Sequence, residues 1–96
     1  MVHPQFLEAH LSTEELHVLG YLNEQWPNAA TITPNAITSS GQIEKTAFVD
    51  VIQSLNDNGL ILYEAFVMGA ESGLRFIETM ITARGRAALR SAQVAA

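Results

Sequence analysis

The sequence predicts a small α+β domain in the order helix, short strand, helix, helix, β-hairpin, helix. Apolar residues recur at helical spacing over 12–26 and again over 44–58. Beyond them the pattern becomes extended, with two strand-like runs around a glycine-containing turn, and a last helical stretch follows. The 96 residues suffice for one domain, 1–96, which buries about 60% of its extended-chain surface without needing a metal or disulfide.

The first helix begins at a capping box. In the run STEE, the Ser12 hydroxyl is placed to accept from the Glu15 amide, while the Glu15 carboxylate reaches back to Ser12. Pro27 ends the apolar series, because the residue before a proline avoids helical geometry. We therefore expect a helix over 12–26, preceded by an N-terminal arm over 1–11.

Two further helices are expected before the hairpin. Residues 31–33 form a short β-prone piece, and Pro34 after a threonine is typical of a first helical position, which predicts a short helix over 34–40. Apolar residues on one face predict a longer helix over 44–58. Gly59 follows at the position where a left-handed C-cap is expected.

A wing-like β-hairpin over 60–82 and a final helix over 83–94 complete the predicted domain. The runs 60–68 and 74–82 are rich in Ile, Leu, Phe, Tyr and Val, and the residues between them favour a turn. Strict alternation along the second strand predicts one face with Ile77, Thr79 and Ile81, and another with Phe76, Glu78 and Met80.

This arrangement resembles the winged helix-turn-helix domains of MarR-like and PadR-like transcription regulators. The run 31–41 is similar to the first helix of the helix-turn-helix pair, and 44–59 is similar to its second, recognition-type helix. LNDNGLI at 55–61 resembles the junction with the wing, and ITARGRAAL at 81–89 resembles the strand-to-helix exit of these regulators. The resemblance implies a winged helix-turn-helix fold with a three-helix core, a two-stranded β-hairpin wing and a C-terminal helix.

The same resemblance implies double-stranded DNA as a partner, contacted in the major groove by the recognition-type helix. On this helix Lys45 suits guanine or phosphate, and Gln53 suits adenine. Polar residues near the helix ends are placed for phosphate contacts. The expected DNA-binding residues are Ser40, Gln42, Lys45, Thr46, Gln53 and, on the wing, Arg75.

Two features of the family are reduced in this sequence. The long helices by which MarR-like regulators dimerise have no counterpart beyond the short C-terminal helix, so small-molecule sensing, which depends on them, is not carried over. The wings of these regulators usually hold several basic residues, whereas this wing tip has Glu71 and the single base Arg75.

The charge balance favours a different interpretation. Acidic residues outnumber basic ones by 10 to 5, giving a formal charge of −5 and a sequence pI near 4.9, which disfavours binding driven by phosphate electrostatics. Residues 44–58 hold one lysine against three acids, whereas 74–96 hold four arginines against one glutamate. Two functions therefore stay open: a small winged-helix DNA-binding transcription regulator, or a winged-helix protein–protein interaction module without DNA affinity.

Other classes of function have little support. The absence of cysteine excludes thiolate nucleophiles and sulfur-ligated zinc. His3, His10 and His17 recur every seven residues, but Pro4 breaks any single helix through them, so we expect no metal, no cofactor and no enzyme activity. The N-terminus lacks a basic start with an apolar run, and no apolar stretch approaches a bilayer span, so we expect a cytoplasmic protein without membrane contact.

Apolar residues exceed what one face of a two-stranded wing can bury. Phe66, Val67 and Met68 lie near the turn, with Phe76 and Met80 on the second strand. Such an excess is typical of a surface that meets another chain. We expect a homodimer, or a protein partner that binds through the wing or the N-terminal arm.

Overall fold

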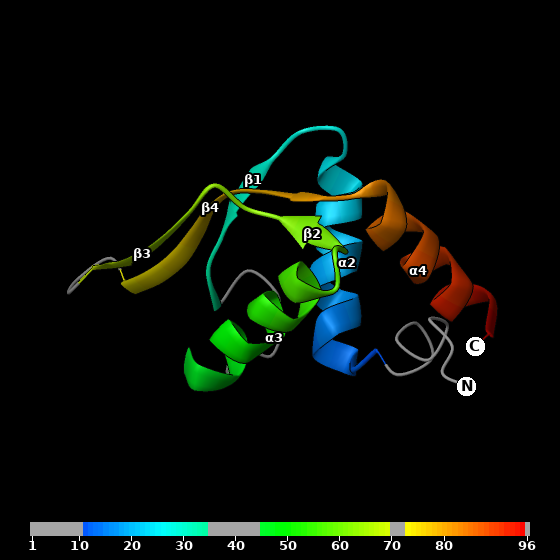
Figure 1. Cartoon of the computed structure of the whole chain (residues 1–96), viewed down its shortest axis with the longest axis horizontal. Coiled ribbons are helices and arrows are strands. Elements are labelled where there is room, and N and C mark those ends of the chain that lie inside the picture. Colours follow the sequence, from blue (N-terminus) through cyan, green and yellow to red (C-terminus); the bar gives the residue numbers. More distant parts are fainter. Residues whose placement is uncertain (1–10, 35–44, 70–72, 96) are drawn as a thin grey trace.

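One long strand, β4 (Gly73–Ile81), organises the fold. The computed structural model describes residues 11–34, 45–69 and 73–95. Strand β1 (Ala30–Ile32) pairs antiparallel with one edge of β4, and β2 (Ile61–Leu62) and β3 (Ala65–Gly69) pair antiparallel with the other (Figure 1). Strand β3 and the part of β4 paired with it form the wing, which extends away from the rest of the domain.

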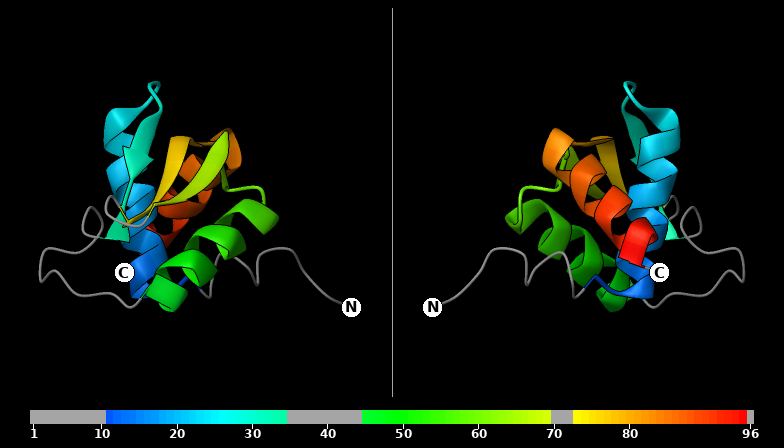
Figure 2. Two further views of the ribbon diagram at one scale, coloured as in Figure 1. Left: turned by 90° about the vertical axis from the view of Figure 1, so that its left-hand side faces the viewer. Right: turned by 90° about the vertical axis from the view of Figure 1, so that its right-hand side faces the viewer.

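The described helices are α2 (Thr13–Gln25), α3 (Lys45–Asp57) and α4 (Ala83–Ala95). Figures 1 and 2 show α3 below the sheet, α2 crossing behind it, and α4 continuing from the end of β4. We call the side of the sheet that is turned towards the helices the inner face, and the opposite side the outer face. The arrangement has the α+β architecture predicted from the sequence.

Each described helix begins and ends within one residue of its predicted bounds. The first strand of the hairpin differs, because it is divided into β2 and β3 at Tyr63 and Glu64. The predicted helix over 34–40, apart from Pro34, and the N-terminal arm, apart from Leu11, lie outside the described residues.

The core forms where α2, α3 and the inner face of the sheet meet. Phe48 and Phe76 are fully buried and meet edge-on with ring centroids 5.6 Å apart, and Tyr63 packs on Phe76 at 4.8 Å. Each such side chain stabilises the fold by about 1.5–3 kcal/mol when fully buried. The buried apolar residues are Val18, Leu19, Leu22, Ile32, Phe48, Ile52, Leu55, Leu60, Ile61, Leu74, Phe76, Ile81, Ala88 and Leu89.

Residues 58–60 and 82–86, which we call the Thr82 junction, hold the end of α3 against the start of α4. Gly59 has a φ of +75°, as predicted for a left-handed C-cap. The Thr82 hydroxyl donates to the Gly59 carbonyl oxygen at 2.7 Å and accepts from the Gly85 amide at 2.9 Å, which caps α4. A Cβ on Gly85 would overlap the Leu60 carbonyl oxygen, so only glycine fits there.

A bulge interrupts β4 and overturns the strict alternation predicted for it. Ala30 pairs with Thr79 and Ile32 pairs with Phe76. Between these two pairs β1 advances by two residues and β4 by three, so β4 contains one extra residue. Glu78 lies in this bulge, is exposed, and has a φ of +54°. The predicted separation of Phe76 from Thr79 was wrong, because one inserted residue moves every later side chain to the other face. The buried residues of β4 are Leu74, Phe76, Thr79 and Ile81.

Candidate nucleic-acid interface

The side of α3 that faces solvent is the candidate recognition surface. Phe48, Ile52 and Leu55 are fully buried on the other side of the helix. The exposed residues recur three or four positions apart and so lie along one line of the helix surface. This outward stripe of α3 consists of Thr46, Asp50, Gln53 and Asp57.

A carboxylate from α2 fixes the rotation of α3. Glu15 accepts through Oε1 from the Ser12 amide at 2.8 Å and through Oε2 from the Ser54 hydroxyl at 3.1 Å. The Ser12 hydroxyl accepts from the Glu15 amide at 3.1 Å, which confirms the predicted capping box. Because Ser54 is half-buried and follows the exposed Gln53, its contact with Glu15 keeps the outward stripe turned to solvent.

The structure brings two of the predicted DNA-binding residues together on this stripe. Thr46 and Gln53 are both exposed, with their side chains on the same side of α3. Lys45 is the first residue of α3, but its side chain lies outside what the structure describes. Ser40 and Gln42 also lie outside the described residues.

Arg75 lies on a different surface from the stripe. It is half-buried on β4, opposite Val67 of β3, and its neighbour Phe76 points into the core. Arg75 therefore belongs to the outer face of the wing, because neighbouring side chains on a strand point to opposite faces. An interface that includes Arg75 and Gln53 has to run from α3 around the wing.

Two further arginines make contacts within the domain. Arg84 donates through Nε to the Asn58 carbonyl oxygen at 3.0 Å. Arg86 donates through Nε to Asn23 Oδ1 at 3.1 Å, and its guanidinium carbon lies 4.7 Å from the centre of the Trp26 ring. These side chains tie α4 to the ends of α3 and α2. Sequence reasoning missed the contacts because the hydrogen-bond partners are 26 and 63 residues apart.

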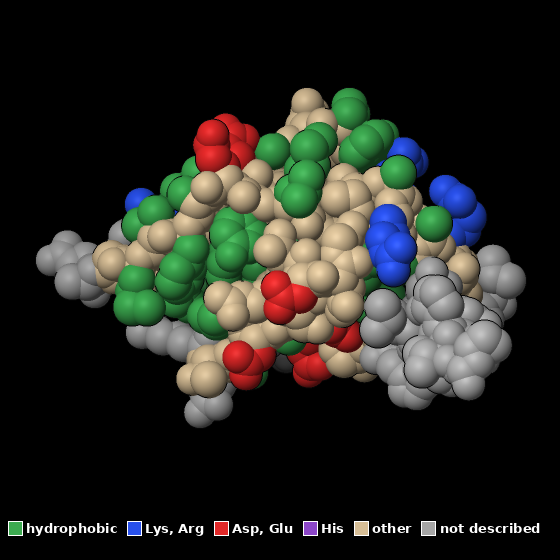
Figure 3. All heavy atoms as spheres, viewed as in Figure 1, with side chains coloured by type: hydrophobic (Ala, Val, Ile, Leu, Met, Phe, Trp, Pro, Cys, Tyr) green, Lys and Arg blue, Asp and Glu red, His purple; other side chains and the backbone are tan. Residues whose placement is uncertain are grey.

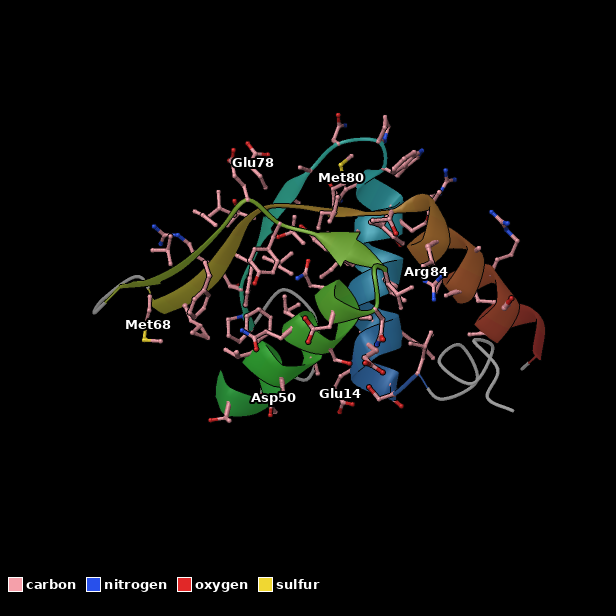
Figure 4. All side chains as sticks on the ribbon, viewed as in Figure 1. Glu14, Asp50, Met68, Glu78, Met80 and Arg84 are labelled. Carbon is pink, nitrogen blue, oxygen red and sulfur yellow. The ribbon has the colours of Figure 1, made fainter. Side chains whose placement is uncertain are left out.

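Acidic side chains surround the outward stripe. Figure 4 shows Asp50 and Glu14 on the same side of the molecule, facing away from the sheet. In Figure 3 acidic groups gather over α3 and the start of α2, with a further group above the sheet, whereas the basic groups lie over α4 and the wing. A phosphate backbone that approaches α3 therefore meets Asp50 and Asp57, which oppose its binding.

Exposed apolar side chains lie on both faces of the sheet. Phe66 is 41% exposed and tilts against Phe76 with ring centroids 4.8 Å apart, on the inner face. Met68 is 70% exposed and points to the same side, whereas Met80 points the opposite way (Figure 4). Leu62 is 58% exposed and pairs with Met80, which places it on the outer face.

The described residues hold neither a metal-binding cluster nor a membrane-spanning helix. They contain no cluster of three or more His, Asp or Glu side chains arranged to hold a metal ion. None of the helices described is long and apolar enough to cross a membrane.

Comparison with solved structures supports the fold. The chain is similar to the crystal structure of a MarR family transcription regulator, with a TM-score of 0.51 and 21% sequence identity. The likeness covers 96% of this chain and 57% of that one, so the chain spans little more than half the length of its neighbour. No protein-family model matches the sequence, and no curated protein matches it significantly. The structural likeness confirms the predicted winged helix-turn-helix fold and, at the level of fold, the resemblance to MarR-like regulators.

Proposed function

We propose that the chain is a small winged-helix transcription regulator that binds double-stranded DNA, with α3 in the major groove and the wing beside it. The observation that carries the proposal is the outward stripe of α3. It is a solvent-facing polar helix surface next to a protruding hairpin, in a fold similar to that of a MarR family transcription regulator.

Within this proposal the side chains divide into base readers and phosphate contacts. Gln53 offers an amide donor and acceptor for adenine, and the Thr46 hydroxyl suits a base edge or a phosphate. Lys45 at the start of α3 and Arg75 on the wing supply the positive charge. The polar residues predicted ahead of α3 remain proposed phosphate contacts.

The carboxylates of the stripe make binding weak and dependent on salt. Asp50 lies between Thr46 and Gln53, so each base contact is made beside a charge that repels phosphate. With few phosphates neutralised, we expect a dissociation constant for non-specific duplex of about 10⁻⁴ M or weaker at physiological salt. Low salt should strengthen the complex enough to map it.

An amide-resolved NMR titration with a mixed-sequence DNA duplex tests the proposal. At low salt we expect shifts concentrated at 46–53 and at Arg75, which become smaller as salt approaches the physiological range. Lys45→Glu should weaken binding by about tenfold. Arg90→Glu is the matched control, because Arg90 is exposed on α4 and undergoes the same charge change. A titration without shifts at low salt would contradict the proposal.

The acidic surroundings of α3 support a second function, a winged-helix module that binds a protein partner and not DNA. Asp50 and Asp57 on the stripe, with Glu14 nearby, complement a lysine-rich or arginine-rich segment. In that case a lysine-rich peptide, and not the duplex, should shift the amides of the outward stripe. Asp50→Lys should then abolish the peptide shifts, whereas it should strengthen binding to DNA if the chain is a regulator.

A further inference from the structure

The outer face of the sheet carries apolar and charged side chains in separate rows. Its apolar part includes Leu62, which is exposed at the edge formed by β2. Because residues paired across antiparallel strands share a face, each row holds one residue from β4 and one from its neighbour. The paired rows are Leu62 with Met80 and, nearer the wing tip, Val67 with Arg75. Glu64, in the break between β2 and β3, and Glu78 on β4 are exposed between these two rows.

Two carboxylates lie between the apolar row and the basic row. The pairing register of β4 with β2 is the same as that with β3, and this register, continued through residues 63 and 64, sets Glu64 opposite Glu78. The Glu64 amide donates to the Ile77 carbonyl oxygen at 2.9 Å, which keeps this segment attached to β4 next to Glu78. Like charges opposite each other destabilise an antiparallel pair. The φ of +54° at Glu78 adds a further cost for a residue that is not glycine.

Positive charge lies one row nearer the wing tip. Arg75 shares the outer face with Glu64 and Glu78, and no hydrogen bond between described residues uses any of these three side chains. The face therefore has an acidic row and a basic row side by side. A two-fold axis that runs across the strands, between Phe76 and Ile77, places the basic row of one copy over the acidic row of another. Such self-complementarity is what a symmetric dimer interface requires.

We propose that the outer face of the sheet binds a second copy of this chain, with the two wings antiparallel. Arg75 of each copy then lies over Glu64 and Glu78 of the other copy and offsets their repulsion. The bulge has a role in this arrangement, because it turns Glu78 to the outer face, where Arg75 of the other copy contacts it.

The apolar side chains of the face fit the same packing. Two sheets that pack face to face lie about 10 Å apart and interdigitate their side chains. In the antiparallel arrangement Leu62 and Met80 of one copy lie over the end of the other wing. There Gly69 pairs with Gly73, and neither has a side chain to obstruct them. Burying Leu62 removes the largest exposed aliphatic side chain of β2 from water.

This dimer determines where the outward stripes lie. Because α3 is below the sheet and the outer face is above it, the two stripes point away from each other (Figures 1 and 2). The pair is thus built to bring together two separate partners, and not to read adjacent half-sites of one duplex. The inference goes beyond the proposed function and leaves the outward stripe open to DNA or protein, but in the dimer Arg75 contacts the other copy and is no longer available to DNA.

Sedimentation equilibrium of the full chain, from low micromolar to submillimolar concentration and without DNA, tests the interface. We expect a reversible dimer that weakens as salt is raised, since the contacts between the two copies at its centre are made by charged side chains. Arg75→Glu should weaken association by about tenfold or more, because three acidic side chains then gather on each face. Combining Arg75→Glu with Glu78→Arg should restore it, and Arg90→Glu is the control of equal charge change.

Leu62→Ser gives an independent variant, because Leu62 is exposed and its replacement leaves the core intact. It should also weaken the dimer, while circular dichroism verifies that every variant remains folded. A chain that is monomeric over the whole concentration range overturns the inference. So does a dimer that neither Arg75→Glu nor Leu62→Ser weakens, because that dimer uses another surface. Since no DNA is present, this result is separate from the DNA titration.

Discussion

The two ends of β4 differ in how firmly the rest of the chain holds them. At the Thr82 junction, Thr82 and Arg84 donate to the backbone at the end of α3, and Gly85 has no room for a side chain. At the wing, Phe66 and Met68 remain exposed, and the backbone of Glu78, the residue of β4 that follows the wing, is strained. The comparison indicates that the junction fixes the fold, whereas the wing keeps surface and strain that binding can use.

The largest loss of stability is expected from a substitution at the point where the wing enters the core. Phe76→Ala removes the ring that contacts Phe48, Tyr63 and Phe66, and should lower the free energy of unfolding by about 3–5 kcal/mol. Phe66→Ala, further out and 41% exposed, should cost less than half as much. Urea denaturation of both variants measures the difference. Equal losses would mean that the wing is as firmly held as the core.

The next largest loss of stability is expected at the Thr82 junction, where one glycine is replaced and a second glycine elsewhere serves as the control. Gly85→Ala introduces a Cβ that would overlap the Leu60 carbonyl oxygen and lie 2.8 Å from Ile81 Cγ1. We expect a loss of about 1–3 kcal/mol in unfolding free energy from overpacking. Gly20→Ala is the matched control, because Gly20 lies within α2 with nothing within 4 Å of the added Cβ. It should stabilise the chain by about 0.5–1 kcal/mol through helix propensity.

The ends of the helices were predictable from the sequence, and the bulge in β4 was not. The capping box at Ser12 and the C-cap at Gly59 depend on residues close together in the chain, so local patterns suffice to find them. The bulge at Glu78 follows from pairing with β1, more than 40 residues earlier, and glutamate gives no signal for a positive φ. Local alternation therefore assigned the faces of β4 wrongly.

In the candidate site, too, local features could be predicted from the sequence and long-range contacts could not. Helical spacing was enough to place Thr46, Asp50 and Gln53 on one exposed line of α3. It could not show that Arg86 lies over Trp26, because that contact joins opposite ends of the sequence. The count of four arginines over 74–96 is therefore not the charge available to a partner, because Arg84 and Arg86 make contacts within the domain.

A smaller effect isolates the hydrogen bonds of the junction. Thr82→Val keeps the shape of the side chain but removes the hydroxyl that contacts Gly59 and caps α4 through the Gly85 amide. We expect a loss of about 1–2 kcal/mol in the free energy of unfolding. Thr13→Val, at an exposed position of α2, should change it by less than about 0.5 kcal/mol. Similar values for both would remove the special role assigned to Thr82.

The smallest effect has opposite signs for folding and for self-association. Glu78→Gly relieves the positive φ and removes one of two neighbouring carboxylates, so the isolated chain should gain about 0.5–1 kcal/mol in unfolding free energy. The same change removes a charge that the proposed dimer places against Arg75, so association should weaken. Thermal melts at low protein concentration report the first quantity, and sedimentation reports the second. If the variant is more stable and also associates as strongly as the wild type, the strain at Glu78 serves neither the fold nor the dimer. If stability falls, the bulge is a structural requirement of β4, and the wing is held more firmly than its exposed side chains indicate.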